Sequence, residues 1–258
     1  MRVIPQIAYL PEAGERGVGD LYLPERVSPG TPIALLIHGG GWSSMDKSRM
    51  VGIAEFLCEQ NFAVFNINYR LLNAGPWPLC GDDCKKAAEF VLAKHIPELD
   101  ICNCERLLIV GGSAGGHLAL MTGLRLPPRQ VSGIISLSGV NDITVYPTDE
   151  SQRKYFFGGE PTEEEIAAAN PISLITPAAP PILCTHTIFD TVVSFKAAEN
   201  FVAKCHEVGA KIEFYRYDRS GDGHCLWIQG SSPPKLLPEL EQAIMQFIAK
   251  YAIATPTP

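Results

Sequence analysis

The stretch I-V-G-G-S-A-G-G-H-L-A-L-M, Ile109–Met121, places four glycines around one serine between two apolar runs. Glycine at this density indicates that the backbone turns sharply or approaches another segment closely. The run 106–111 reads as a buried strand and 114–124 as a helix, so the stretch forms a strand–turn–helix unit. In that context Gly111–Gly115 fits G-x-S-x-G, in which the serine at the elbow lifts its hydroxyl above the sheet edge. We therefore predict Ser113 as a nucleophile, with a plain glycine-rich loop as the alternative.

The rest of the chain alternates between strand-like and helix-like segments, which indicates an α/β fold with a mostly parallel sheet and helices on both faces. The strand-like runs are 32–38, 62–68, 106–111, 131–138, 181–186 and 211–217, and helical spacing covers 46–60, 82–95, 114–124, 195–208 and 237–253. The alternation breaks at 141–180, which we expect to be an insertion or small cap within a single domain spanning 1–258. Ligands of such sheets bind at the carboxyl ends of the strands.

Composition and charge narrow the class of partner. Hydrophobic residues make up 46% of the 258 residues, which is enough to bury a sizeable core. The net charge of −7 argues against a nucleic-acid or anionic-membrane partner, because few cations are present to neutralise phosphates. No apolar run approaches the ~20 residues of a membrane span, and the N-terminal segment lacks the apolar core of a signal peptide. We therefore expect a cytoplasmic protein without a membrane span.

The eight cysteines fit neither a disulfide framework nor a zinc site. Cys58, Cys84 and Cys205 fall in helical patterns and Cys184 in a strand-like run, as is typical of small buried hydrophobic residues. No His/Cys pair has the spacing of a zinc finger. We predict free thiols and no bound metal.

A second glycine-rich turn, H-G-G-G-W over His38–Trp42, follows the strand-like run 32–38. Three consecutive glycines allow backbone N–H groups to point into a cavity without side chains in the way. A simple glycine turn with Trp42 as a core anchor is the alternative interpretation.

A serine hydroxyl needs a base to accept its proton at neutral pH. We predict His224, because it lies in the glycine-rich loop S-G-D-G-H after the strand-like run that ends at Tyr217, within reach of a neighbouring strand end. His117 lies one turn into the helix after Ser113 and is expected to point along that helix, while His38 is expected to brace the glycine turn. The remaining histidines end a strand or lie on helices: His95, His186 and His206.

The base in turn needs a carboxylate that orients its ring. We predict Asp190, which follows the strand-like run 181–186 and gives the chain order serine, aspartate, histidine expected of this sheet type. Asp142, after the preceding strand, is the main alternative. Asp218 and Asp222 are further candidates, although Asp222 is too near the histidine to turn back easily onto its ring.

With these motifs the chain resembles the α/β-hydrolases of the esterase/lipase kind, in the branch that carries H-G-G-G upstream of G-x-S-A-G-G. The motifs that carry the resemblance are H-G-G-G-W (38–42), Y-R-L (69–71), G-G-S-A-G-G-H-L-A (111–119), S-G-V-N-D (138–142), D-T-V-V (190–193) and G-D-G-H (221–224). The chain is similar to small carbohydrate-type esterases, the acetylxylan esterase-like and feruloyl esterase-like members. The resemblance implies an α/β-hydrolase fold and an oxyanion hole made by the N–H groups of Gly40, Gly41 and Ala114.

Two positions depart from the family pattern. Gly112 precedes the serine where many hormone-sensitive-lipase relatives carry an acid. The segment H-T-I-F over 186–189 replaces a glycine-containing turn that is common before the aspartate.

These residues lead us to expect a serine carboxylesterase that acts on small, short-acyl esters through an acyl-enzyme, without metal or organic cofactor. Acetylated or feruloylated carbohydrate is the substrate class implied by the resemblance. H-G-G-x-W is also typical of kynurenine formamidase-like hydrolases. Because Trp42 completes this motif, hydrolysis of an N-formyl amide is the alternative activity. A non-catalytic ligand-binding relative is the remote alternative, since such proteins typically lose a member of the Ser-His-Asp set.

Overall fold

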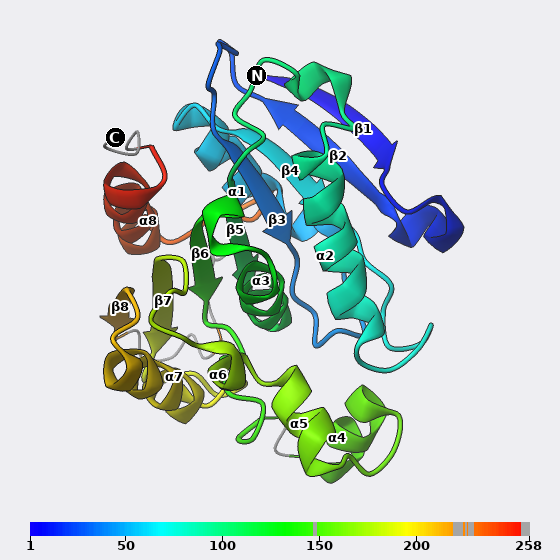
Figure 1. Cartoon of the computed structure of the whole chain (residues 1–258), viewed down its shortest axis with the longest axis vertical. Coiled ribbons are helices and arrows are strands. Elements are labelled where there is room, and N and C mark those ends of the chain that lie inside the picture. Colours follow the sequence, from blue (N-terminus) through cyan, green and yellow to red (C-terminus); the bar gives the residue numbers. More distant parts are fainter. Residues whose placement is uncertain (147–148, 219–223, 225, 227–229, 254–258) are drawn as a thin grey trace.

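The computed structural model describes residues 1–146, 149–218, 224, 226 and 230–253 (Figure 1). Within these residues eight strands form one sheet in the order β1-β2-β4-β3-β5-β6-β7-β8. The strands are β1 (Arg2–Ala8), β2 (Val18–Leu23), β3 (Ile33–Ile37), β4 (Ala63–Ile67), β5 (Leu107–Gly112), β6 (Val131–Leu137), β7 (Ile182–Thr187) and β8 (Ile212–Tyr217). From β4 to β8 neighbouring strands are parallel, whereas β2 is antiparallel to both β1 and β4.

Helices cover both faces of the sheet. One face packs against α2 (Leu79–Leu92), α3 (Ala114–Arg125) and α7 (Phe195–Val208), and the other against α1 (Val51–Glu59) and α8 (Pro238–Tyr251). Side chains alternate between the two cores along each strand, so that Leu35 of β3 faces one core and Leu36 the other. Burial on both faces explains why the central strands read as continuous apolar runs rather than alternating ones.

The predicted strands and helices are confirmed, with differences at their ends and at the N-terminus. The expected helix 46–60 divides into a 3-10 helix, η2 (Lys47–Met50), and α1, and α2 begins three residues before the expected start at 82. The β1–β2 hairpin was not predicted, because β1 is an edge strand whose seven residues are exposed or half-buried and carry no apolar run. Three further 3-10 helices are η1 (Pro11–Arg16), η3 (Pro97–Leu99) and η4 (Pro128–Gln130).

The segment between β6 and β7, where the alternation breaks, contains three short helices. They are α4 (Glu150–Phe157), α5 (Glu163–Ala169) and α6 (Pro171–Leu174). A capping box between Thr162 and Glu165 starts α5, which accounts for a helix in so acidic a run. In Figure 1, α4 and α5 lie beyond the carboxyl ends of the strands. The segment therefore stands at the edge of the sheet where a ligand is expected.

The cysteines within the described residues are buried and unpaired, as predicted. They are Cys58, Cys80, Cys84, Cys102, Cys104, Cys184 and Cys205. Burial raises the pKa of the Cys58, Cys80 and Cys205 thiols to about 12. These thiols therefore remain protonated and behave as small core residues.

Among the described helices, none has both the length and the apolar character required to cross a lipid bilayer.

Candidate active site

Ser113 occupies a strained turn between β5 and α3. Its backbone has φ 57° and ψ −127°, a conformation that non-glycine residues rarely adopt. The amide of Ser113 donates to the Leu137 carbonyl at 2.9 Å, and its own carbonyl accepts from the Gly116 amide at 2.9 Å. These bonds hold the strained residue from both sides.

The glycines that flank the turn have no room for a side chain. A Cβ at Gly111 would collide with the carbonyl of Gly115, and a Cβ at Gly115 would collide with the carbonyls of Ile37 and His38 at the end of β3. The helix start thus packs directly against the backbone of the neighbouring strand. This contact explains why the sequence needs glycine two residues before and two residues after the serine.

The glycine loop after β3 lies beside Ser113. Gly40 and Gly41 have positive φ values of 105° and 57°. In the described part of the chain, no group accepts a hydrogen bond from the amides of Gly40, Gly41 or Ala114. The loop and the start of α3 therefore carry N–H groups that are available to a ligand at this sheet edge.

His38 braces this loop from beneath. Arg16 donates to its Nε2 at 3.2 Å, so Nδ1 carries the proton and donates to the Gly39 carbonyl at 2.7 Å. Tyr69 stacks on the imidazole with ring centroids 4.2 Å apart, and its hydroxyl donates to the His38 carbonyl at 3.0 Å. Burial lowers the pKa of His38 to about 4, so the ring is neutral.

Trp42 and His117 connect the glycine loop to the inserted segment. Trp42 Nε1 donates to His117 Nδ1 at 3.3 Å, so His117 Nε2 carries the proton and donates to the Ala169 carbonyl of α5 at 2.8 Å. The ring of Phe156 packs on Trp42 with centroids 4.6 Å apart. His117 therefore makes its polar contacts with the loop and the insertion, and it is fully buried.

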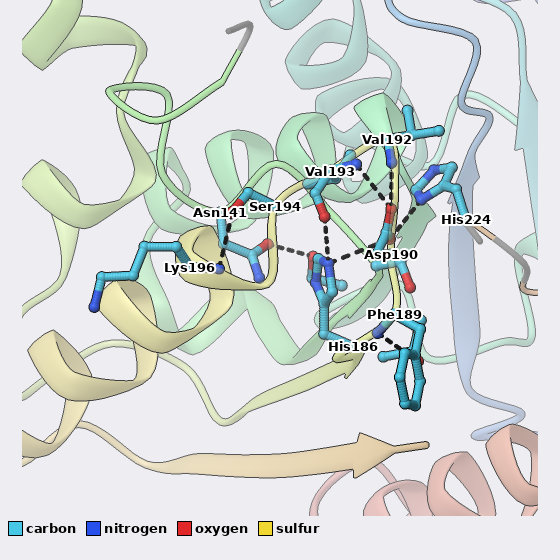
Figure 2. Close-up of polar contacts among 12 residues, drawn as sticks. Asn141, His186, Phe189, Asp190, Val192, Val193, Ser194, Lys196 and His224 are labelled. Carbon is cyan, nitrogen blue, oxygen red and sulfur yellow. Dashed lines mark hydrogen bonds and ion pairs between the residues drawn. The ribbon is translucent and has the colours of Figure 1, made fainter. Parts of the chain in front are cut away.

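His224 and Asp190 lie in contact (Figure 2). His224 Nδ1 is 2.7 Å from Asp190 Oδ2, and because a carboxylate can only accept, Nδ1 carries the proton. His224 Nε2 is buried and has no hydrogen-bond partner within the described part of the chain. The rest of the predicted loop, residues 220–223, lies outside the described residues.

Three further donors fix the carboxylate of Asp190. Oδ1 accepts from the amides of Val192 at 2.9 Å and Val193 at 2.8 Å, and Oδ2 lies 3.3 Å from His186 Nε2. Burial acts to raise the pKa of Asp190, but the hydrogen bonds from His186, His224 and the Val193 amide, together with the charge of His224, hold it well below its usual range. Asp190 is therefore ionised and oriented by its surroundings.

The alternative carboxylates are engaged elsewhere or lie outside the described residues. Asp142 is buried and accepts from Thr144, Asn170 and Asn200, which join the inserted segment to α7. Asp218 is exposed and pairs with the neighbouring Arg216. Asp222 is not among the described residues.

Ser113, His224 and the glycine loop line one pocket of about 410 Å³. Its remaining walls are mostly apolar, and among the described lining residues Arg49 adds a cationic side chain that no sequence motif marked. The lining residues are Gly39, Gly40, Gly41, Ser44, Met45, Arg49, Met50, Gly112, Ser113, Tyr146, Val192, His224 and Leu226. Arg49 lies within the capped 3-10 helix η2 rather than at a strand end, so no strand-end pattern marks it.

The described residues contain no group of three or more His, Cys, Asp or Glu side chains arranged to hold a metal ion. What the pocket does hold together is a serine on a strained turn, a histidine ring oriented by a carboxylate, and backbone N–H groups without partners. Such an arrangement can accept a proton and stabilise a developing negative charge in the same place.

Comparison with known proteins relates most of the chain to one family. The sequence profile of the BD-FAE family matches residues 19–205. The versiconal hemiacetal acetate esterase stcI of Emericella nidulans is 32% identical over 136 residues, which cover 51% of this chain and 44% of that protein. A kynurenine formamidase of Danio rerio is 28% identical over 132 residues, covering 48% of this chain and 42% of that protein. The matches thus span a little under half the length of these two relatives.

A truncated carbohydrate esterase from gut microbiota superimposes on the structure with a TM-score of 0.83 at 22% identity. The superposition covers 97% of this chain and 96% of the other. At this level of identity the likeness concerns the arrangement of strands and helices.

Proposed function

The chain belongs to the BD-FAE family and has the α/β-hydrolase fold, and from that membership we propose that it is a serine carboxylesterase acting through Ser113, His224 and Asp190. The observation that carries the proposal is the state of His224. Its Nδ1 proton is held by Asp190 at 2.7 Å, its ring lines the same pocket as Ser113, and its Nε2 has no hydrogen-bond partner among the described residues. A base with that tautomer can accept a proton only at Nε2.

In the first half-reaction Ser113 Oγ attacks the ester carbonyl carbon while His224 Nε2 accepts the hydroxyl proton. Asp190 stabilises the imidazolium that forms. The carbonyl oxygen becomes an oxyanion that the N–H groups of Gly40, Gly41 and Ala114 hold. Loss of one such donor typically costs ~10²–10³ in turnover. His224 then gives the proton to the leaving alkoxide, and the acyl group remains on the serine.

In the second half-reaction water attacks the acyl-enzyme, and His224 again acts as the base. The tetrahedral intermediate collapses, the acid leaves, and the proton on His224 returns to Ser113 Oγ. Water is thus the second substrate, and Ser113 and His224 carry out both half-reactions.

The pocket supports small substrates. Its volume of about 410 Å³ lies at the lower end of the range for small-molecule sites. Met45, Met50, Val192 and Leu226 give it an apolar wall that suits a short acyl chain. We propose short-acyl esters as the substrate class, and an acetylated carbohydrate as the first natural substrate to test.

The experiment compares the wild type with Ser113→Ala in hydrolysis of 4-nitrophenyl acetate and of acetylated xylo-oligosaccharide. We expect kcat to fall by ~10⁴ or more in the variant. Ser173→Ala removes an exposed serine on α6 and serves as the matched control with unchanged kcat. Unchanged turnover in Ser113→Ala would reject the catalytic assignment and favour a non-catalytic relative.

A second candidate function is hydrolysis of an N-formyl amide on the same residues. Trp42 of H-G-G-G-W is buried and bonded to His117, and one curated relative is a kynurenine formamidase. Parallel assays with 4-nitrophenyl acetate and an N-formyl aryl amine separate the two candidates. A strong preference in kcat/KM for the formamide would replace the esterase proposal.

A further inference from the structure

We propose that His186 is a positioning residue that locks the Asp190 carboxylate in the orientation required by His224. The proposal rests on the triad proposed above and adds a second buried histidine to it. His186 is the penultimate residue of β7 and Asp190 follows it by four residues, so both are carried by the same strand end. The side chains of both are fully buried.

The contacts of His186 determine its tautomer. Its Nε2 lies 3.0 Å from the Val193 carbonyl oxygen and 3.3 Å from Asp190 Oδ2. Both oxygens can only accept, so Nε2 carries the proton. Nδ1 is buried without a hydrogen-bond partner in the described part of the chain.

His186, Asp190 and Val193 contact one another across the turn after β7: two of the three contacts are hydrogen bonds, and the third is the 3.3 Å approach of His186 Nε2 to Asp190 Oδ2 (Figure 2). The Val193 amide donates to Asp190 Oδ1 at 2.8 Å, and the Val193 carbonyl accepts from His186. His186 then approaches the other carboxylate oxygen, Oδ2, which also accepts from His224. Rotation of the carboxylate would break bonds on both of its oxygens, so His224 meets a fixed acceptor.

The titratable groups that face this carboxylate come from three segments. They are His186 on β7, His224 after β8 and Tyr146 after β6, whose pKa is raised by burial and then by the charge of Asp190. The ring of Phe195 on α7 packs edge-on against His186, with centroids 5.9 Å apart. In the described residues no Lys or Arg forms an ion pair with Asp190. The two histidines are therefore the side-chain donors that hold it.

Removal of the His186 donor is expected to have two measurable effects. The carboxylate gains rotational freedom, and kcat falls by ~10–100-fold with little change in KM, because a small misplacement in the catalytic set affects the chemical step. Oδ2 also loses its second imidazole contact, so a side chain that restores an N–H near the position of Nε2 should restore kcat.

The test uses three variants of the full chain, assayed with 4-nitrophenyl acetate across pH. His186→Leu removes the donor, His186→Gln places an amide N–H near the position of Nε2, and His186→Asn places it near Nδ1, where it cannot reach Oδ2. We expect the Gln variant to retain kcat within a few-fold and both the Leu and the Asn variants to lose it. Thr185→Val is the matched control: Thr185 is buried on the same strand and its hydroxyl has no partner among the described residues, so kcat stays as in the wild type.

Equal kcat values in the Gln and Asn variants would overturn the proposal, and this comparison remains decisive if the Leu variant fails to fold. A Leu variant that folds and keeps the kcat of the wild type would overturn it as well. Failure of the triad itself is a separate result. Ser113→Ala would then keep its activity, whereas failure of the His186 proposal leaves Ser113→Ala inactive and the His186 variants unaffected.

Discussion

His117 gives the protein a specific sensitivity to acid. Its ring is fully buried, accepts from Trp42 at Nδ1 and donates to the Ala169 carbonyl at Nε2. Burial lowers the pKa of His117 from 6.5 to about 4. Between pH 6.5 and about pH 4, His117 therefore binds a proton in the unfolded chain but not in the folded chain. His117 contributes stability in full above pH 6.5, and that contribution is lost progressively as the pH falls toward 4.

The size of the effect follows from the shift in pKa. Between pH 7 and pH 5, a histidine shifted from 6.5 to about 4 loses about 2 kcal/mol of its contribution to the free energy of unfolding. Protonation at Nδ1 would also remove the acceptor of the Trp42 indole N–H, so the glycine loop and the insertion lose their link at the same time. His38, whose pKa is lowered to about 4 by its own burial, adds a similar effect in the wild type.

The measurement is urea unfolding at pH 7 and at pH 5 for the wild type and for His117→Gln. The variant loses the Nδ1 acceptor of the Trp42 indole at both pH values, whereas its amide N–H lies near the position of Nε2, and it lacks the titrating ring. We therefore expect its loss of stability between pH 7 and pH 5 to be smaller than that of the wild type by about 2 kcal/mol. His95→Gln, which removes an exposed histidine, is the control and should follow the wild type. Equal losses in wild type and His117→Gln would refute the reasoning.

Three further changes are predicted. Gly115→Ala places a Cβ against backbone carbonyls of β3 and should lower the melting temperature and kcat, whereas Gly159→Ala, with open space around it, should change neither; calorimetry and the acetate assay test both. Asp190→Asn should lower kcat by ~10³–10⁴, because the amide favours the wrong tautomer of the histidine it contacts. Asp142→Asn keeps most of the bonds to the insertion and should retain kcat within a few-fold; the reverse ranking of these two variants would exchange their roles. Arg49→Gln should raise KM ~10-fold for an ester that bears a carboxylate and leave KM for 4-nitrophenyl acetate unchanged; equal KM changes for both esters would contradict this.

The sequence was most informative where a local pattern decides the backbone. The strained turn at Ser113 could be predicted, because glycine two residues before and two residues after the serine indicates that the backbone packs there with no room for a side chain. The sequence evidence for the contact between His224 and Asp190 was weaker. Chain order and the common edge of parallel strands indicated that the two residues lie close together, but the 2.7 Å contact between His224 Nδ1 and Asp190 Oδ2 depends on side-chain conformation. Their catalytic roles remain predictions that the Ser113→Ala and Asp190→Asn assays test.

Contacts that depend on side-chain direction across long separations could not be predicted. Trp42 and His117 are 75 residues apart, and no spacing rule joins an indole in a loop to an imidazole on a helix. His186 is the final case. The sequence placed the end of its strand at 186, one residue before the observed end at Thr187, but no pattern indicated that its Nε2 contacts both Asp190 and the Val193 carbonyl.

The buried thiols provide a set of internal reporters of motion. Cys80 and Cys84 are on α2, Cys184 is on β7 and Cys205 is on α7, and each is fully buried. A maleimide or disulfide reagent can reach such a thiol only when its own part of the protein opens. Labelling rates at each position, resolved by mass spectrometry, would therefore give the free energy of local opening region by region, without any engineered probe.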